Sequence, residues 1–443
     1  MAMKVYMVNL GCAKNVVDGE FMLGSMARMG AILCEDPADA DVIVVNTCSF
    51  IEDAVDESVD TILELARFRQ SGVCRRLVVC GCLPQRYGDA LADAMPEVDL
   101  FFGTGAYDIA AEAVSGLADE LPRCTLPDPV RQPLPGKDDD RIYTVNHTVY
   151  IKIAEGCDRH CTYCIIPALR GRQRSRPIAD IAAEAGRAVA SGASEVVLVA
   201  QDTTSYGRDL GAGICLADLL KTVSSACGKE TWVRVLYMHP EAVDDALLDS
   251  IASCGNICRY FDIPIQHSSD RILKRMGRRI SAGRMEETFK AIRDAFPEAV
   301  LRTTVMVGFP GEQRADFEKL LDFITAVEFD HLGAFIYSDS DDIASHNLDA
   351  HVTAKTARRR YDRLMSVQAV ISRRKNEARV GKICEVLVEE KAAEDVFVGR
   401  AWFQAPEVDG EVCFSGFAGH SVGDRVKVRI TGATEYDLEG EAL

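Results

Sequence analysis

The stretch HTVYIKIAEGCDRHCTYCIIPALRGRQRSR, residues 147–176, joins an apolar strand pattern to a group of thiols. Cys157, Cys161 and Cys164 follow the strand at the spacing C-x3-C-x2-C. In α/β folds, ligands gather beyond the carboxyl ends of parallel strands. Thiolates suit zinc or iron–sulfur clusters, and a structural zinc site would need a fourth ligand. Three thiolates leave one iron of a four-iron cluster open, so the stretch predicts a catalytic cluster.

Five further β-rich runs follow this stretch, and helical patterns such as residues 178–192 and 315–329 separate them. The runs are EVVLVAQD, WVRVLYMHP, RYFDIPIQH, LRTTVMVGFPGE and HLGAFIYSD. Six strand–helix repeats with right-handed crossovers predict a partial (β/α) barrel. We expect this central domain to span residues 136–375 and to end in a long basic helix that begins near Lys355.

Three strands of the buried, parallel type are expected before that domain, at residues 4–10, 41–46 and 76–80. Helical spacing between them predicts an N-terminal doubly wound parallel α/β domain over residues 1–135. Cys12, Cys48 and Cys82 each come just past one of these strands, which indicates a second group of three ligands at one sheet edge. The alternative is three ordinary buried cysteines, because their spacing alone does not link them.

The last part of the chain, residues 376–443, differs from the rest. Its short alternating runs predict a small antiparallel β-barrel: KICEVLVEE, DVFVGRAWF, EVCFSG and RVKVRITGA. It carries 14 Asp and Glu against 7 Lys and Arg. A linker is expected at LPDPVRQPLPGKDDDR, residues 126–141, which is rich in proline and charge.

Composition restricts the compartment and the partners. The chain has 443 residues, 48% hydrophobic and 27% charged, and no apolar run near the roughly 18 residues that span a bilayer. The N-terminus lacks the layout of a secretory signal, and 16 cysteines suit a reducing compartment, so we expect a cytoplasmic protein. A net charge of -18 disfavours indiscriminate binding to phosphate backbones and favours a basic protein partner.

The cysteine motif, with an aromatic residue before its last cysteine, resembles that of the radical S-adenosylmethionine (radical-SAM) enzymes. With the second cysteine group and a TRAM-like C-terminal barrel, the whole chain resembles the methylthiotransferases. The segments GCAKNVVDGE, VLYMHP, YFDIPIQHSSDRILKRMGR and GRAWFQAPEVDGEV are similar to the RimO type of that family. Enzymes of this type add a methylthio group to the β-carbon of an aspartate in small-subunit ribosomal protein S twelve. Ala13 departs from the proline usual in that type.

The resemblance implies two [4Fe-4S] clusters and SAM as cofactors. Cys157, Cys161 and Cys164 would bind the radical-SAM cluster, whose open iron chelates SAM. Cys12, Cys48 and Cys82 would bind an auxiliary cluster that holds a sulfur species. The implied SAM contacts are Tyr163, Gln201, Asp202 and Gly308. Further substrate or SAM contacts are expected at Arg170, Arg172, Arg174, Gln266 and His267, since arginine clamps carboxylates.

The implied reaction needs no catalytic side chain beyond the cluster ligands. A flavodoxin or ferredoxin would reduce the first cluster, SAM would give a 5′-deoxyadenosyl radical, and sulfur from the auxiliary cluster would capture the substrate radical. A second SAM would supply the methyl group, and the sulfur donor is left open. Two alternatives stand beside this interpretation. A tRNA methylthiotransferase acting on a modified adenosine should carry a basic C-terminal barrel. A non-catalytic iron–sulfur electron carrier should have four ligands for each cluster.

Overall fold

The computed structural model describes residues 3–114, 120–136, 140–416 and 419–443. Its contacts divide the chain into two compact units. Unit 1 comprises residues 1–144, 154–159 and 164–176; unit 2 comprises residues 145–153, 160–163 and 177–443. Residues 137–139 of the predicted linker lie outside the described part of the chain, and the predicted boundaries of three domains stay a prediction. Among the helices described, none combines the length and apolar composition needed to cross a bilayer.

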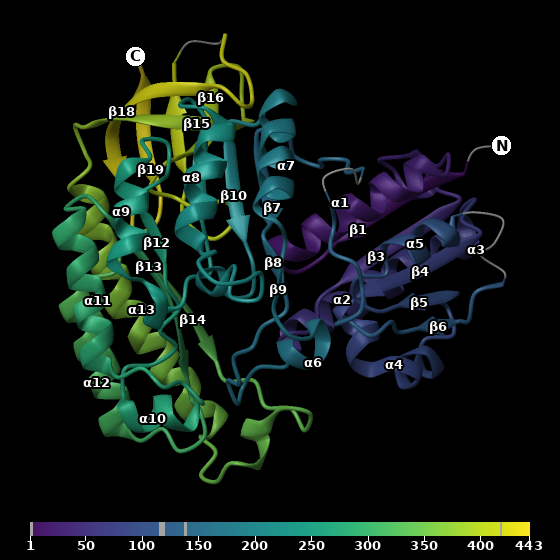
Figure 1. Cartoon of the computed structure of the whole chain (residues 1–443), viewed down its shortest axis with the longest axis horizontal. Coiled ribbons are helices and arrows are strands. Elements are labelled where there is room, and N and C mark those ends of the chain that lie inside the picture. Colours follow the sequence, from purple (N-terminus) through teal and green to yellow (C-terminus); the bar gives the residue numbers. More distant parts are fainter. Residues whose placement is uncertain (1–2, 115–119, 137–139, 417–418) are drawn as a thin grey trace. The chain divides into compact units, whose positions relative to one another are not determined.

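Unit 1 is built on a parallel sheet with the strand order β2-β1-β3-β4-β5-β6 (Figure 1). Its strands are β1 (Lys4–Asn9), β2 (Ile32–Leu33), β3 (Val42–Thr47), β4 (Arg76–Gly81), β5 (Leu100–Phe102) and β6 (Cys124–Thr125). Its helices are α1 (Ala13–Arg28), α2 (Glu52–Ala66), α3 (Phe68–Ser71), α4 (Cys82–Ala94), α5 (Tyr107–Ala113) and α6 (Ile166–Arg170). The three strands expected from the sequence are therefore present, as the central strands of this sheet.

Helices cover both faces of this sheet, because its central strands are apolar on both sides. In β3, every residue is buried. Ile43 and Val45 pack with residues of α2 and α4, whereas Val42 and Val44 pack with residues of α1 and α5. This alternation follows the two-residue repeat of a strand. The prediction of a doubly wound α/β domain is confirmed.

Unit 2 contains the six strands of the partial barrel as two parallel sheets, β11-β10-β7 and β12-β13-β14. A parallel bridge between Val233 and Ile257 continues the first sheet towards the second. The strands are β7 (Thr148–Lys152), β10 (Glu195–Val199), β11 (Trp232–Val235), β12 (Tyr260–Asp262), β13 (Val300–Val307) and β14 (His331–Ile336). All six coincide with runs that the sequence indicated, and β13 begins one residue before its run.

Helices connect these strands in the order expected of (β/α) repeats, and Figure 1 shows them running alongside the sheets. They are α7 (Ile178–Ala190), α8 (Leu216–Cys227), α9 (Asp245–Ser253), α10 (Asp270–Arg275), α11 (Ala282–Ala295), α12 (Arg314–Val327) and α13 (Ala354–Glu377). The basic helix expected after the barrel is α13. It ends at Glu377, and Ala378 caps it.

The C-terminal residues of unit 2 form a closed barrel with the order β15-β16-β17-β19-β18. Its strands are β15 (Ile383–Lys391), β16 (Val396–Ala401), β17 (Val412–Ser415), β18 (Arg425–Ala433) and β19 (Leu438–Ala442). The sequence indicated four of these strands and missed β19, whose alternation of Leu438, Gly440 and Ala442 with glutamates contains one large apolar residue. β17 and β19 pair in parallel. A closed ring of five strands cannot alternate in direction throughout, so one parallel pair is required.

A buried ion-pair network joins this barrel to the first residues of the (β/α) strands. Glu195, the first residue of β10, pairs with Arg234 at 2.6 Å and with Arg400 of β16 at 2.7 Å. Arg400 also pairs with Glu389 at 2.7 Å and donates to Thr148 Oγ1 at 3.3 Å. The C-terminal barrel is thus attached at the amino ends of β7 and β10, whereas ligands of (β/α) folds gather at the carboxyl ends.

Candidate cysteine centres and ligand site

Three neighbouring strands of unit 1 deliver the dispersed cysteines to one sheet edge. Cys12 caps the start of α1 after β1, Cys48 follows β3, and Cys82 begins α4 after β4. These strands are adjacent and parallel, so their carboxyl ends lie side by side. The loops are in close contact: a Cβ on Gly11 would lie 2.5 Å from Cys48 Cβ and 2.9 Å from its Sγ. Gly11, with φ +87°, is therefore required there.

Asn15 and Ser58 fix two of the cysteine-bearing loops. The Asn15 side-chain amide donates to the carbonyl oxygens of Leu10 at 3.0 Å and Thr47 at 2.9 Å, which ties the segments before Cys12 and Cys48 together. The Cys48 amide donates to Ser58 Oγ at 3.3 Å, and that hydroxyl donates to the Cys48 carbonyl at 2.9 Å. These bonds hold the backbone of the site without using the thiols.

The turn at Gly81 separates Cys82 from Cys80, which the alternation of the strand could not do. Cys80 is 1% exposed and packs in the sheet core, with its sulfur 3.8 Å from that of Met22. Gly81 has φ +97°, and a Cβ there would lie 2.6 Å from Asn46 Oδ1. This left-handed residue redirects the chain, so that Cys82 leaves the core and begins α4.

Charge distinguishes the three thiols. Burial alone would raise the pKa of Cys12, but Lys14, Arg170 and two backbone hydrogen bonds together lower it. Burial and the neighbouring Cys82 raise the pKa of Cys48 to about 11. Burial also raises the pKa of Cys82, against the opposing charge of Arg170. The nearby cations therefore favour the thiolate of Cys12, and at Cys48 and Cys82 Arg170 only opposes the effect of burial.

This donor set fits an iron–sulfur cluster. It consists of soft sulfur ligands, and Arg170 and Lys14 supply positive charge beside it. Within the described ranges, no three His, Cys, Asp or Glu side chains are grouped to bind one metal ion. Thiolates of a four-iron cluster each bind a different iron, so they lie further apart than the ligands of a single ion.

The loop with the C-x3-C-x2-C motif is closed at its base in unit 1. Short strands β8 (Ala154–Glu155) and β9 (Arg174–Ser175) pair antiparallel, and the Cys157 amide donates to the Gly171 carbonyl at 3.1 Å. Cys157 and Cys164 are both half-buried. In unit 2, the part of the loop with the half-buried Cys161 is held by Thr162, whose amide donates to the Met276 carbonyl at 3.0 Å.

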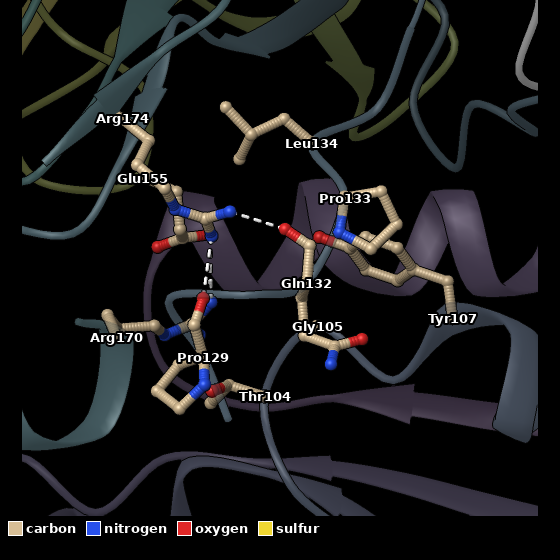
Figure 2. A pocket seen from close by; sticks show the side chains of 10 residues that line it. All are labelled: Thr104, Gly105, Tyr107, Pro129, Gln132, Pro133, Leu134, Glu155, Arg170 and Arg174. Atoms are coloured by element: carbon tan, nitrogen blue, oxygen red, sulfur yellow. Dashed lines mark hydrogen bonds and ion pairs between the residues drawn. The ribbon is translucent and has the colours of Figure 1, made fainter. Parts of the chain in front are cut away.

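The arginines after the motif have different surroundings in unit 1. The side chain of Arg172 is 83% exposed and pairs with Asp158 at 3.3 Å. Arg174 donates to the carbonyl oxygens of Gln132 and Pro129, as Figure 2 shows. Arg176 is 1% exposed. The Arg170 side chain is 3% exposed and bonds to four side chains of unit 1.

A pocket of unit 1 opens beside Arg170 and Glu155 (Figure 2). Arg174 and Tyr107 belong to the same lining, and the tyrosine hydroxyl donates to Asp18 Oδ1 at 2.6 Å. Tyr107 and Arg170 thus bond to side chains behind the lining, and Arg174 bonds to the backbone.

Four of the residues expected to contact SAM lie after the strands of unit 2. The Tyr163 hydroxyl accepts a hydrogen bond from Arg278 at 3.2 Å, and its ring meets Phe309 edge-on with centroids 6.4 Å apart. Phe309 follows Gly308, so two expected SAM contacts lie close together. Gln201 and Asp202 directly follow β10, and Asp202 accepts hydrogen bonds from Thr204 and Ser205 within η3 (Thr203–Ser205) and its cap.

A buried carboxylate holds Gly308. The Gly308 amide donates to Glu312, which also pairs with Arg360 at 3.1 Å. His267 is fully buried, with Nε2 3.7 Å from Glu312. Its Nδ1 accepts hydrogen bonds from the amides of Ser268 and Ser269, both at 2.9 Å. Nε2 therefore carries the proton and faces the carboxylate.

Gln266 lies beside β13, where it forms a parallel bridge with Val305. Its φ is +66°, a conformation that a residue other than glycine rarely adopts. Its amide donates to the Thr304 carbonyl at 2.8 Å, and its carbonyl accepts from the Met306 amide at 2.8 Å. The strained backbone is therefore fixed against β13 on both sides. Such strain concentrates at ligand sites.

Several residues of these sites were not singled out from the sequence. They are Asn15, Asp18, Glu155, Arg278 and Glu312. Asn15 follows Cys12 by three residues, and Asp18 follows Asn15 by three, so each is a neighbour of the preceding one on the surface of α1. Glu312 ends the GFPGE segment, four residues after Gly308, and this short separation lets its carboxylate accept from the Gly308 amide.

Family models match most of the chain. Residues 4–103 match the Uncharacterized protein family UPF0004, residues 151–324 match the Radical SAM superfamily, and residues 380–443 match the TRAM domain. The radical-SAM match covers β7 to α12, and the TRAM match covers the closed C-terminal barrel. The matched families thus agree with the fold class expected from the sequence.

Two relatives match along nearly the whole chain. A ribosomal protein uS12 methylthiotransferase RimO from Desulfosudis oleivorans is 62% identical over 440 residues, which are 99% of this chain and 100% of the relative. A protein of the same name from Fervidobacterium nodosum is 46% identical, with 100% and 99% covered. Among solved structures, the radical SAM methyltransferase TsrM from Kitasatospora setae has a TM-score of 0.57 and 14% identity, with 78% and 77% covered. That likeness concerns the fold alone.

Proposed function

Because the chain belongs to the family of the ribosomal protein uS12 methylthiotransferases, we propose that it adds a methylthio group to the β-carbon of an aspartate in ribosomal protein uS12, the S twelve protein of the small subunit. It is an enzyme of the radical-SAM class, and its cofactors are SAM and two [4Fe-4S] clusters. Held by the two cysteine triads, these groups would supply radical chemistry at an unactivated carbon and the transfer of sulfur.

We assign Cys157, Cys161 and Cys164 to the radical-SAM cluster. Their spacing within one loop supports this assignment, as does the closure of that loop by β8 and β9. Each set of three thiolates would leave one iron of its cluster without a protein ligand. That iron would be free to bind SAM in the first cluster and a sulfur species in the auxiliary cluster.

The observation that carries the proposal is the auxiliary site. Cys12, Cys48 and Cys82 follow three adjacent parallel strands, the loops of Cys12 and Cys48 are in close contact at Gly11, and Arg170 donates to Cys82 Sγ at 3.4 Å. Three thiols concentrated among fixed cations suit an anionic iron–sulfur cluster better than a packed core.

We assign SAM binding to Tyr163, Gln201, Asp202 and Gly308 in unit 2. Gly308 has φ +79°, and a Cβ there would lie 2.6 Å from Ala357 Cβ, so glycine lets this turn pack closely against α13 while Glu312 fixes the direction of its amide. We propose that Gln266 and His267 shape the SAM site without binding SAM directly. Gln266 provides a strained turn beside β13, and His267 faces Glu312 from within the core.

A protein substrate is favoured over tRNA by the C-terminal barrel. Phe403 is 3% exposed, and Arg379 lies over its ring at 3.7 Å from the centroid, so this ring does not offer a stacking face to a base. The acidic balance of residues 376–443 favours a basic ribosomal protein. We therefore propose that this barrel recognises uS12, free or on the ribosome, in the cytoplasm, with a flavodoxin or ferredoxin as reductant.

The proposal is tested by mass spectrometry of small-subunit proteins and of tRNA nucleosides from cells that lack the gene. We expect uS12 to lose one methylthio group and the tRNA nucleosides to stay unchanged. Loss of a methylthio nucleoside, with uS12 unchanged, would identify tRNA as the substrate instead.

A further inference from the structure

We propose that Arg170 is a positioning residue for the auxiliary cluster: it holds the Cys82 sulfur by hydrogen bond and charge and raises the reduction potential of that cluster. Arg170 belongs to the arginine-rich segment that follows Cys164, so a segment of one cysteine motif serves the other. The inference rests on the proposed function, because it assumes that Cys12, Cys48 and Cys82 bind a cluster.

The guanidinium lies inside unit 1, with its two terminal nitrogens turned to different partners. Nη2 is 3.4 Å from Cys82 Sγ and 2.5 Å from Asn15 Oδ1. Nη1 is 2.5 Å from Asp18 Oδ2 and 3.3 Å from Glu155 Oε2. The side chain is 3% exposed. Its planar fork is therefore held at both ends, which fixes the N–H that points at the sulfur.

The partners of Arg170 connect all three loops of the auxiliary site. Asn15 binds the loops that carry Cys12 and Cys48, and Arg170 joins Asn15 to Cys82. Asp18 is held in turn by the Tyr107 hydroxyl at 2.6 Å. Removal of the guanidinium would leave two buried carboxylates and one sulfur without this cation.

Reduction adds an electron to a cluster that its thiolates already make anionic. A fixed positive charge with an N–H donor at a ligand sulfur stabilises the reduced form more than the oxidised form. Lysine could preserve the charge, but it could not reach Asn15 and Cys82 with a rigid fork. The effect of Arg170 on the reduction potential of the auxiliary cluster can therefore be measured separately from its contribution to packing.

The test uses the full chain with Cys157, Cys161 and Cys164 replaced by alanine, so that one cluster remains. In this parent we compare Arg170→Met and Arg170→Lys by iron content and by redox titration followed by electron paramagnetic resonance (EPR). We expect Arg170→Met to shift the midpoint potential of the auxiliary cluster to a more negative value, and Arg170→Lys to shift it less. Arg75→Met is the matched control: Arg75 is 81% exposed in the same unit, and we expect no shift.

The outcomes separate this inference from the proposed function. A parent protein that binds no four-iron cluster would overturn the auxiliary site itself. A parent with a cluster, and an Arg170→Met potential equal to that of Arg75→Met, would overturn the role of Arg170. If Arg170→Met does not fold, the test depends on Arg170→Lys, which lacks the planar guanidinium. A midpoint potential of the auxiliary cluster in Arg170→Lys equal to that of the parent protein would contradict the inference.

Discussion

The two cysteine triads of this chain are built in opposite ways. Cys157, Cys161 and Cys164 lie within a single loop, and all three are half-buried. Cys12, Cys48 and Cys82 come from three strand ends, and the last two are buried. The first triad depends on local sequence, whereas the second depends on a folded sheet and on Arg170 beside it.

With the cysteines assigned as we propose, this difference gives each triad a different part in the reaction. A loop that carries all its own ligands can present an open iron to a soluble cofactor such as SAM. A site assembled from three strand ends, with buried cations around it, is suited to hold a sulfur species away from water. The predictions below use variants that affect one triad at a time, ordered by the size of the expected effect.

The largest effect is expected from Cys161→Ala. With two thiolates left in the loop, the radical-SAM cluster should not form in a state that binds SAM, and 5′-deoxyadenosine production should fall by more than about 100-fold. The measurement is chromatography of the reaction products after reduction with dithionite. Production at the wild-type rate would remove this triad from SAM cleavage.

Cys48→Ala should uncouple SAM cleavage from sulfur insertion. We expect 5′-deoxyadenosine formation to continue, because the radical-SAM triad is intact, while methylthio insertion into a uS12 peptide stops. The matched control is Cys80→Ala, which removes a sulfur packed against Met22 at a cost of about 1 kcal/mol and should retain the product. Methylthiolated peptide from Cys48→Ala would contradict the auxiliary role of this cysteine.

Glu195→Gln should lower stability without acting on either triad. Glu195 pairs with two buried arginines at the start of β10, and breaking such a pair costs about 3–5 kcal/mol. Both tryptophans of the chain lie beside this network: Trp232 begins β11, and the Trp402 carbonyl accepts from Arg234. Urea unfolding followed by their fluorescence measures the loss. Glu318→Gln, at an exposed pair, should leave the midpoint unchanged.

A smaller effect is expected from acid. Although burial would raise it, the pKa of Glu195 is lowered from its ordinary value of 4.5 by Arg234 and Arg400. Its folded value is below its unfolded value, so its contribution is complete above about pH 4.5 and declines as the pH falls towards the folded pKa. The urea midpoint reported by tryptophan should therefore fall below this pH, and Glu195→Gln should flatten that decline. Equal slopes in the two proteins would contradict this linkage.

The sequence predicted most of the fold because the strands are strongly apolar. Three of the six strands of the N-terminal sheet and all six barrel strands were found, since runs such as residues 42–47 are buried throughout, whereas the short strands β2, β5 and β6 were missed. The strand β19 was missed because glycine and glutamate dominate it.

The sites were predictable where ligands are local and harder to predict where the fold assembles them. C-x3-C-x2-C predicts a cluster from spacing alone. Cys12, Cys48 and Cys82 could be grouped only because each follows a strand. Arg170 was expected to meet SAM or substrate, and its partners on α1 could not be foreseen, because no sequence spacing links residues 15 and 170.

The central claim is that each triad leaves one iron open but that only one of them receives SAM. The most direct measurement is EPR of two reconstituted variants, one with Cys12, Cys48 and Cys82 replaced by alanine and one with Cys157, Cys161 and Cys164 replaced. We predict that each binds a single four-iron cluster and that SAM changes the spectrum of the first variant alone. A spectrum that responds to SAM in the second variant, and not in the first, would contradict the account.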